Sequence, residues 1–146
     1  KMNYNLTPQE KNNYCACSVL QSIFREYRIE KSQEDIFRNL TPSEKGVVLI
    51  DEKFSEFVRS QGFNYQFYFY NETPFNEPDM ILKEKGNMFF TWDKHVRLIE
   101  NFEDPLVKFI DPLDGKKDTK DLRKVMNIMS KYKDGLFGII TQNDKS

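Results

Sequence analysis

The sequence predicts an α+β domain in which an N-terminal helical half packs on a C-terminal antiparallel sheet. Apolar residues recur at helical spacing before Gly62, and after it the period changes to the two-residue alternation of strands. Only 38% of the residues are hydrophobic, but 13 Phe, 7 Tyr and 1 Trp supply enough apolar area for a packed core. The length of 146 residues suits one domain, so we expect residues 1–146 to fold together.

Three helices are expected before Gly62. Residues 15–27 predict the first, and Cys15 stands at its start; its buried stripe would consist of Val19, Leu20, Ile23, Phe24 and Tyr27. Ser32, with Asp35 three residues later, resembles a capping box and opens a second helix that runs to residue 40. Asp51 begins a third helix, which Gly62 ends.

Strands dominate the rest of the chain. Residues 63–69 alternate aromatic with polar side chains, which predicts a core strand, with Tyr68 and Tyr70 as the alternative lining of a peptide groove. Residues 80–85 predict a short helix, and strands are expected at 87–92, 95–101 and 107–110. After turn residues at 111–115, a helix over 119–132 with a solvated, charged start and a strand at 136–141 complete the prediction.

Composition excludes several classes of function. The 22 Lys and Arg nearly balance the 23 Asp and Glu, so a net charge of -1 provides no field that would attract a nucleic acid. The sequence has neither a glycine-rich phosphate loop nor an apolar run long enough for a membrane helix. The spacing of Cys15 and Cys17 is not that of a structural zinc site, so no metal and no cofactor are expected. A disulfide between them would be strained, and free thiols favour a cytoplasmic location.

Four residues could together form a thiol-dependent active site. A helix N-terminus stabilises a thiolate, and Cys15 has that setting. His95 is the only histidine, so any imidazole base must be this residue. Asp111 follows the next strand, where it would lie beside His95 and orient the ring. Gln9 precedes Cys15 closely enough for its amide and the Cys15 N–H to form an oxyanion hole. Singly, each residue is typical of ordinary core or turn structure; the prediction depends on their combination.

These residues belong to segments that occur in the order and at the intervals of a known family. The segments are Gln9 and Cys15 with five residues between them, the apolar helix 18–24, His95 with strand 96–99, the sequence Phe109-Ile110-Asp111-Pro112 followed by Gly115, and residues 133–140. In this arrangement almost the whole chain resembles the papain-like peptidases that process bacteriocin precursors at a double-glycine leader.

The resemblance implies a papain-like cysteine endopeptidase. Cys15 would be its nucleophile, His95 the general base and then acid, Asp111 the orienting partner of His95, and Gln9 the oxyanion donor. The substrate would be a peptide or protein, in particular a double-glycine leader peptide. An ABC exporter in the same polypeptide or operon would be the partner, because such peptidase modules are found ahead of these exporters.

Two positions depart from the family's pattern. The family usually has Asp before the nucleophile and Gly after it, whereas this sequence has Tyr14 and Ala16. A divergent stand-alone papain-like protease that acts on another protein is therefore an alternative. An amide hydrolase or acyltransferase with the same constellation and a catalytically silent peptide-binding domain are further alternatives.

Overall fold

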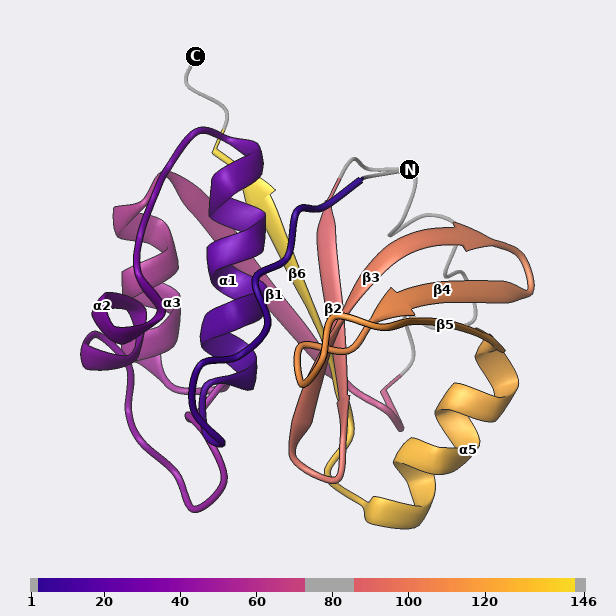
Figure 1. Ribbon diagram of the computed structural model, residues 1–146. Helices are drawn as coiled ribbons and strands as arrows, with labels where there is room; N and C mark the ends of the chain where they lie inside the picture. The colour runs from indigo at the N-terminus through magenta and orange to yellow at the C-terminus, as the bar shows by residue number, and fades with distance from the viewer. Residues whose placement is uncertain (1–2, 73–85, 144–146) are drawn as a thin grey trace.

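A computed structural model describes residues 3–72 and 86–143 of the chain (Figure 1). Its helices are α1 Cys15–Glu26, α2 Gln33–Arg38, α3 Glu52–Ser60 and α5 Leu122–Tyr132. Its strands are β1 Phe63–Phe69, β2 Asn87–Trp92, β3 His95–Glu103, β4 Leu106–Ile110, β5 Lys117–Asp121 and β6 Leu136–Gln142. The helix expected at residues 80–85 lies outside the described residues.

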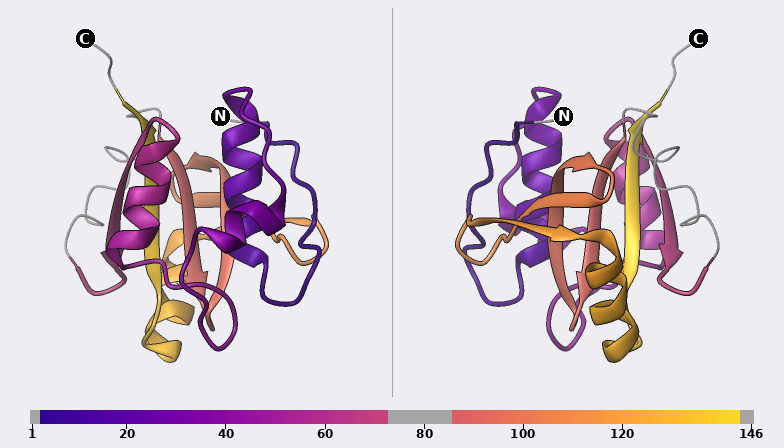
Figure 2. Two further views of the ribbon diagram at one scale, coloured as in Figure 1. Left: turned by 90° about the vertical axis from the view of Figure 1, so that its left-hand side faces the viewer. Right: turned by 90° about the vertical axis from the view of Figure 1, so that its right-hand side faces the viewer.

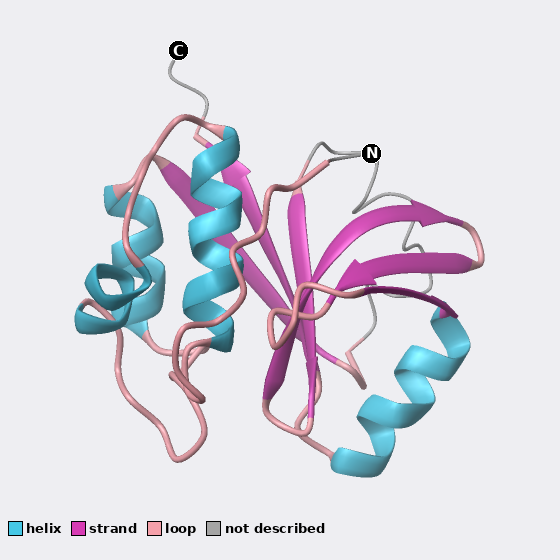
Figure 3. Ribbon diagram, in the orientation of Figure 1, coloured by secondary structure: helices cyan, strands magenta, loops and turns pink. Residues whose placement is uncertain are grey.

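The strands form one antiparallel sheet with the order β1-β6-β2-β3-β4-β5. Helices α1, α2 and α3 cover one face of this sheet, and α5 lies on the other (Figures 2 and 3). A hydrophobic cluster fills the space on each side, the larger one under the three N-terminal helices. The predicted α+β class is confirmed, with α5 as a second layer on the far face of the sheet.

The predicted helix starts follow from side-chain caps. The hydroxyl of Ser32 accepts a hydrogen bond from the Asp35 N–H at 3.0 Å, and a carboxylate oxygen of Asp51 accepts one from the Phe54 N–H at 3.0 Å. Gly62 ends the third helical segment with a φ of 96°, which favours glycine over any other residue. Within the described ranges, every helix is too short or too polar to cross a bilayer.

The aromatic alternation of β1 serves the core. Phe63 is buried, and three further aromatic side chains pack against the same cluster, namely those of Tyr65, Phe67 and Phe69. Tyr68 and Tyr70 point to the other face and pack against the cluster beneath α5. The prediction that this stripe is core is therefore confirmed, and the two tyrosines contribute to packing.

The prediction of a helix start at residue 119 is wrong, because residues 117–121 form strand β5. The segment pairs with β4 along its whole length, from Ile110 opposite Lys117 to Leu106 opposite Asp121. The buried carboxylate of Glu100 anchors it through the Lys117 ammonium at 3.0 Å. Such an edge strand lacks an apolar alternation that periodicity could detect. The helix begins after it, with Asp121 as its N-cap.

An N-terminal segment over residues 3–14 runs along α1 and connects the helices to the sheet (Figure 1). The Ser18 hydroxyl donates to the Thr7 carbonyl at 2.6 Å. The Gln9 backbone N–H donates to the Pro112 carbonyl at 2.7 Å, which joins this segment to the turn after β4. These bonds place Gln9 between the start of α1 and the end of β4.

Candidate active site

Cys15 is the first residue of α1, and this helix begins at the end of the molecule where β2 turns into β3 (Figure 1). Its side chain is buried, with 2% of the residue exposed. The preceding Tyr14 makes no side-chain capping bond to the helix. The N–H groups of a first helical turn have no acceptors within the helix, so they remain available to a negatively charged group beside the thiol.

The two positions that depart from the family's pattern contribute to packing. The ring of Tyr14 lies 4.9 Å from that of Phe37, and the ammonium of Lys11 lies 5.4 Å from the Tyr14 ring centroid. Ala16 is 3% exposed and belongs, like Tyr14, to the larger core cluster under the N-terminal helices. Tyr14 thus adds contact between α1 and α2, and neither side chain displaces Cys15 from the helix start.

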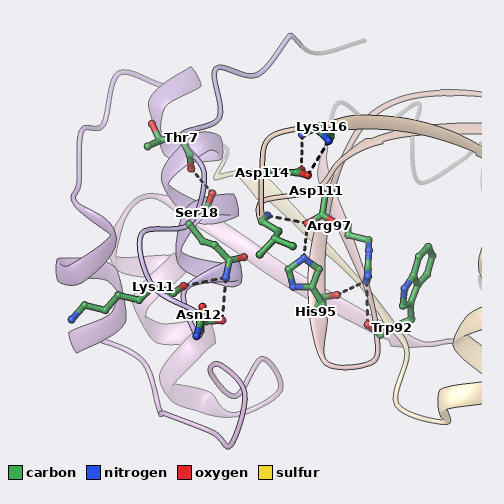
Figure 4. A network of polar contacts seen from close by, with 12 residues as sticks. Thr7, Lys11, Asn12, Ser18, Trp92, His95, Arg97, Asp111, Asp114 and Lys116 are labelled. Atoms are coloured by element: carbon green, nitrogen blue, oxygen red, sulfur yellow. Dashed lines mark hydrogen bonds and ion pairs between the residues drawn. The ribbon is translucent and has the colours of Figure 1, made fainter.

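His95 and Asp111 form a direct pair where β3 begins and β4 ends (Figure 4). The His95 Nε2 atom lies 2.6 Å from Oδ1 of Asp111. The same carboxylate oxygen accepts a hydrogen bond from the Leu113 N–H at 2.9 Å, which holds Asp111 in its turn. The thiol of Cys15 has a side-chain hydrogen bond with His95. Since Nε2 is occupied by Asp111, Nδ1 is the ring nitrogen left for the thiol.

The electrostatic environment favours a charged thiol and imidazole pair. Burial alone raises the pKa of the Cys15 thiol, but hydrogen bonds from His95 and from the backbone of Val96 and Ala16 outweigh it, and the net pKa is lowered. Burial lowers the pKa of His95, whereas its bonds to Cys15 and Asp111 raise it above the ordinary value. Burial raises the pKa of Asp111, but the His95 and Leu113 bonds bring it below its usual range. The three groups therefore support a thiolate, an imidazolium and a carboxylate in a row.

Cys17 is close in sequence to Cys15 and has a different environment. It is fully buried within the helical layer, and burial together with the neighbouring Cys15 raises its pKa to about 12. Both cysteines are free thiols. Only Cys15 therefore has the properties of a reactive nucleophile.

Gln9 lies on the segment that approaches the start of α1, as the sequence suggested, but its amide is already engaged. Its Nε2 group donates to the carbonyls of Lys11 and Asn12, each at 3.0 Å. Its Oε1 atom is buried and has no hydrogen-bond partner among the described residues. Gln9 would have to release one carbonyl to donate to an oxyanion.

An apolar cavity of about 460 Å³ opens beside Cys15. The loop between α2 and α3 and the ends of four strands form its walls, with Val47, Leu49, Phe69, Val96 and Leu136 among the lining residues. A Cβ atom added at Gly46 would lie 3.9 Å from the Cys15 sulfur, so this glycine keeps the approach to the thiol open. Sequence reasoning missed this loop because it belongs to no helix or strand.

A second, smaller depression lies on the His95 side of the thiol. It is lined by His95 but not by Cys15, whereas the apolar cavity is lined by Cys15 but not by His95. Glu44 and Lys94 line both, and their side chains form an ion pair at 3.8 Å. Because both groups are well exposed, this pair contributes little stability, but it marks the boundary between the two depressions.

The described residues contain no group of three His, Cys, Asp or Glu side chains close enough to hold a metal ion. The arrangement of Cys15 and His95 can supply a nucleophilic thiolate and an imidazolium able to donate a proton. Sequence reasoning also missed Arg97 and Trp92. Arg97 donates hydrogen bonds to the backbone carbonyls of both Trp92 and His95. A basic residue between the apolar residues Val96 and Leu98 was the signal available for Arg97.

Solved structures share this fold, among them the following two. One is the crystal structure of a double-glycine motif protease from an AMS/PCAT transporter in complex with the leader peptide; its TM-score is 0.73 at 16% identity, and the match covers 98% of this chain and 94% of that chain. The other is the peptidase domain of Streptococcus ComA, a bi-functional ABC transporter involved in a quorum-sensing pathway; its TM-score is 0.70 at 16% identity, with 97% and 100% covered. No protein-family model and no curated protein matches the sequence. The fold predicted by resemblance is confirmed.

Proposed function

We propose that this protein is a papain-like cysteine endopeptidase that cleaves leader peptides after a double glycine. The observation that carries the proposal is the row of Cys15, His95 and Asp111, with the thiol at a helix start and Asp111 2.6 Å from His95. The fold likeness to two peptidase domains, one of them bound to a leader peptide, supports the substrate class. The free thiols suit a reducing compartment, and we place the enzyme in the cytoplasm beside an ABC exporter.

In this proposal the Cys15 thiolate attacks the carbonyl carbon of the scissile bond and forms a tetrahedral intermediate. The His95 imidazolium then gives its proton to the leaving amine, and an acyl-enzyme thioester remains on Cys15. His95, now neutral, takes a proton from water, which attacks the thioester and releases the acid. Asp111 keeps the ring oriented and stabilises its charge throughout, as the third residue of a triad does.

The negative charge on the carbonyl oxygen needs hydrogen-bond donors. The Cys15 N–H at the first position of the helix would be one, and the amide of Gln9 would be the other. Gln9 donates to two backbone carbonyls in the resting structure. Exchange of one of these for a bond to an oxyanion is favourable, because a hydrogen bond to a charged acceptor is about twice as strong as a neutral one.

The two depressions suggest how the peptide lies. The leaving amine must be near His95, which protonates it, so the depression lined by His95 would receive the residues after the scissile bond. The apolar cavity beside Cys15 would then receive residues before it, which remain on the enzyme as the acyl group. Its aliphatic walls suit an apolar leader side chain upstream of two glycines that pass Gly46.

Cleavage of matched synthetic peptides tests the proposal. An amphipathic leader peptide with a Gly-Gly site and the same peptide with Ala-Ala would each be incubated with the wild type, Cys15→Ala and the control Cys17→Ala, and products identified by mass spectrometry. We expect cleavage after Gly-Gly by the wild type and Cys17→Ala and none by Cys15→Ala. Equal rates for Gly-Gly and Ala-Ala would reject the leader specificity but retain the peptidase. Activity in Cys15→Ala would reject the mechanism.

A further inference from the structure

The turn that carries His95 is a two-residue hairpin between β2 and β3. Trp92 pairs with His95 across it, and the two residues between them, Asp93 and Lys94, have φ values of 51° and 57°. Residues other than glycine reach this left-handed region at a cost in free energy, so such a turn needs support from its surroundings. Because His95 is the first residue after the turn, a change in the turn would move the imidazole.

Arg97 provides contacts on both sides of this turn (Figure 4). Its Nη1 group donates to the Trp92 carbonyl at 3.1 Å and to the His95 carbonyl at 2.9 Å. Its guanidinium lies over the Trp92 ring, 4.0 Å from the centroid, which adds a cation–π contact. One planar side chain thus joins the last residue of β2 to the first residue of β3.

Arg97 also faces Asp111. Leu98 of β3 pairs with Ile110 of β4, so the next residues outward on the two antiparallel strands, Arg97 and Asp111, lie opposite each other. Arg97 and Asp111 line one depression together with Trp92. The charged or ionisable groups that interact with the guanidinium are Asp111, Cys15, Asp93 and Tyr132.

We propose that Arg97 is a positioning residue of the His95–Asp111 pair, which fixes the imidazole through the two carbonyls that flank its turn. This inference rests on the proposed function. Its charge adds a second effect, because a cation beside these groups favours their less protonated forms. A lysine would keep that charge but could not hold both carbonyls while it lies flat on the Trp92 ring.

Two substitutions separate geometry from charge. We expect Arg97→Met to slow both peptide cleavage and alkylation of Cys15 by about 10- to 100-fold, the range for a displaced reacting group. Both limbs of its pH–rate profile should move to higher pH, because removal of a positive charge raises the pKa of every nearby group. Arg97→Lys should lower the rate and leave the profile in place. The control is Arg123→Met, since Arg123 lies exposed at the start of α5.

The measurements are the rates of cleavage of a Gly-Gly leader peptide and of iodoacetamide labelling against pH, with thermal denaturation of each variant. Wild-type rates and profile in Arg97→Met, or equal effects in Arg123→Met, would overturn the inference. If Arg97→Met does not fold, Arg97→Lys decides: a lower rate at an unchanged profile supports the role, and a wild-type rate rejects it. Failure of the wild type itself to label Cys15 or to cleave any peptide would instead reject the proposed function.

Discussion

Replacement of Asp111 by Asn tests whether charge, and not shape alone, prepares the imidazole. In the structure one carboxylate oxygen of Asp111 accepts bonds from His95 at 2.6 Å and from the Leu113 N–H at 2.9 Å. An asparagine carbonyl can accept the same two bonds, so Asp111→Asn should keep the ring orientation. It removes only the negative charge beside the imidazolium.

The size of the effect follows from the contact and its exposure. An opposite charge in direct contact shifts a pKa by about 1 to 3 units. The side chains of His95 and Asp111 are 22% and 32% exposed, so solvent screening weakens the effect of the carboxylate on the pKa of His95 but does not remove it. Burial lowers the pKa of His95, but the bonds to Cys15 and Asp111 raise it, and the net pKa lies above the ordinary value. The imidazolium is therefore present at low pH and lost as pH rises through this raised value.

Without the negative charge of the Asp111 carboxylate, the His95 imidazolium loses its proton at a lower pH. We expect the alkaline limb of the pH–rate profile of Asp111→Asn to move to lower pH, by an amount at the lower end of the general range for a contacting charge. The acid limb, which reports ionisation of Cys15, should move less, because the carboxylate bonds to His95 and not to the thiol.

The assay is the rate of iodoacetamide labelling of Cys15 against pH, followed by mass spectrometry. Asp114→Asn is the matched control: Asp114 lies in the same turn and binds the Lys116 N–H at 3.0 Å. An alkaline limb that stays in place in Asp111→Asn, or that moves equally in both variants, would show that the charge of Asp111 does not set the state of His95.

Further predictions concern the nucleophile, the oxyanion donor, the approach to the thiol and the core. Brief treatment with iodoacetamide should label Cys15 and leave Cys17 unmodified; preferential labelling of Cys17 would contradict the assignment. Gln9→Ala should lower kcat by about 100-fold, the low end for an oxyanion donor because two carbonyl bonds already occupy the amide, while the labelling rate stays unchanged; a loss of only a few-fold would make Gln9 a loop residue. Gly46→Val should keep the fold but slow labelling by bulky reagents more than by small ones, since its Cβ would already contact the sulfur at 3.9 Å; equal slowing would refute this. Gly138→Ala should lower the free energy of unfolding by about 1 to 3 kcal/mol in urea titration, because its Cβ would overlap the buried ring of Phe89, and a neutral effect would mean that β6 can shift.

Much of the secondary structure could be predicted from the sequence because it depends on local interactions. The caps of Ser32 and Asp51 act within one helical turn, and Gly62 needs its own positive φ. The aromatic alternation of residues 63–69 is a property of neighbouring residues as well. The polar strand at residues 117–121 was missed because it depends on pairing with β4 and on the buried Glu100, and these contacts outside the segment leave no periodic pattern within it.

The features of the candidate site also fall into those that the sequence predicts and those that depend on the tertiary structure. The sequence by itself determined that Cys15 begins a helix and that His95 is the only imidazole, since both are properties of the chain. Only the tertiary structure decided that Asp111 reaches His95, that the amide of Gln9 is occupied by carbonyls, and that Arg97 spans the turn before His95. These contacts join different strands or loops, and their distances depend on strand register, twist and turn conformation, which no spacing within the sequence specifies.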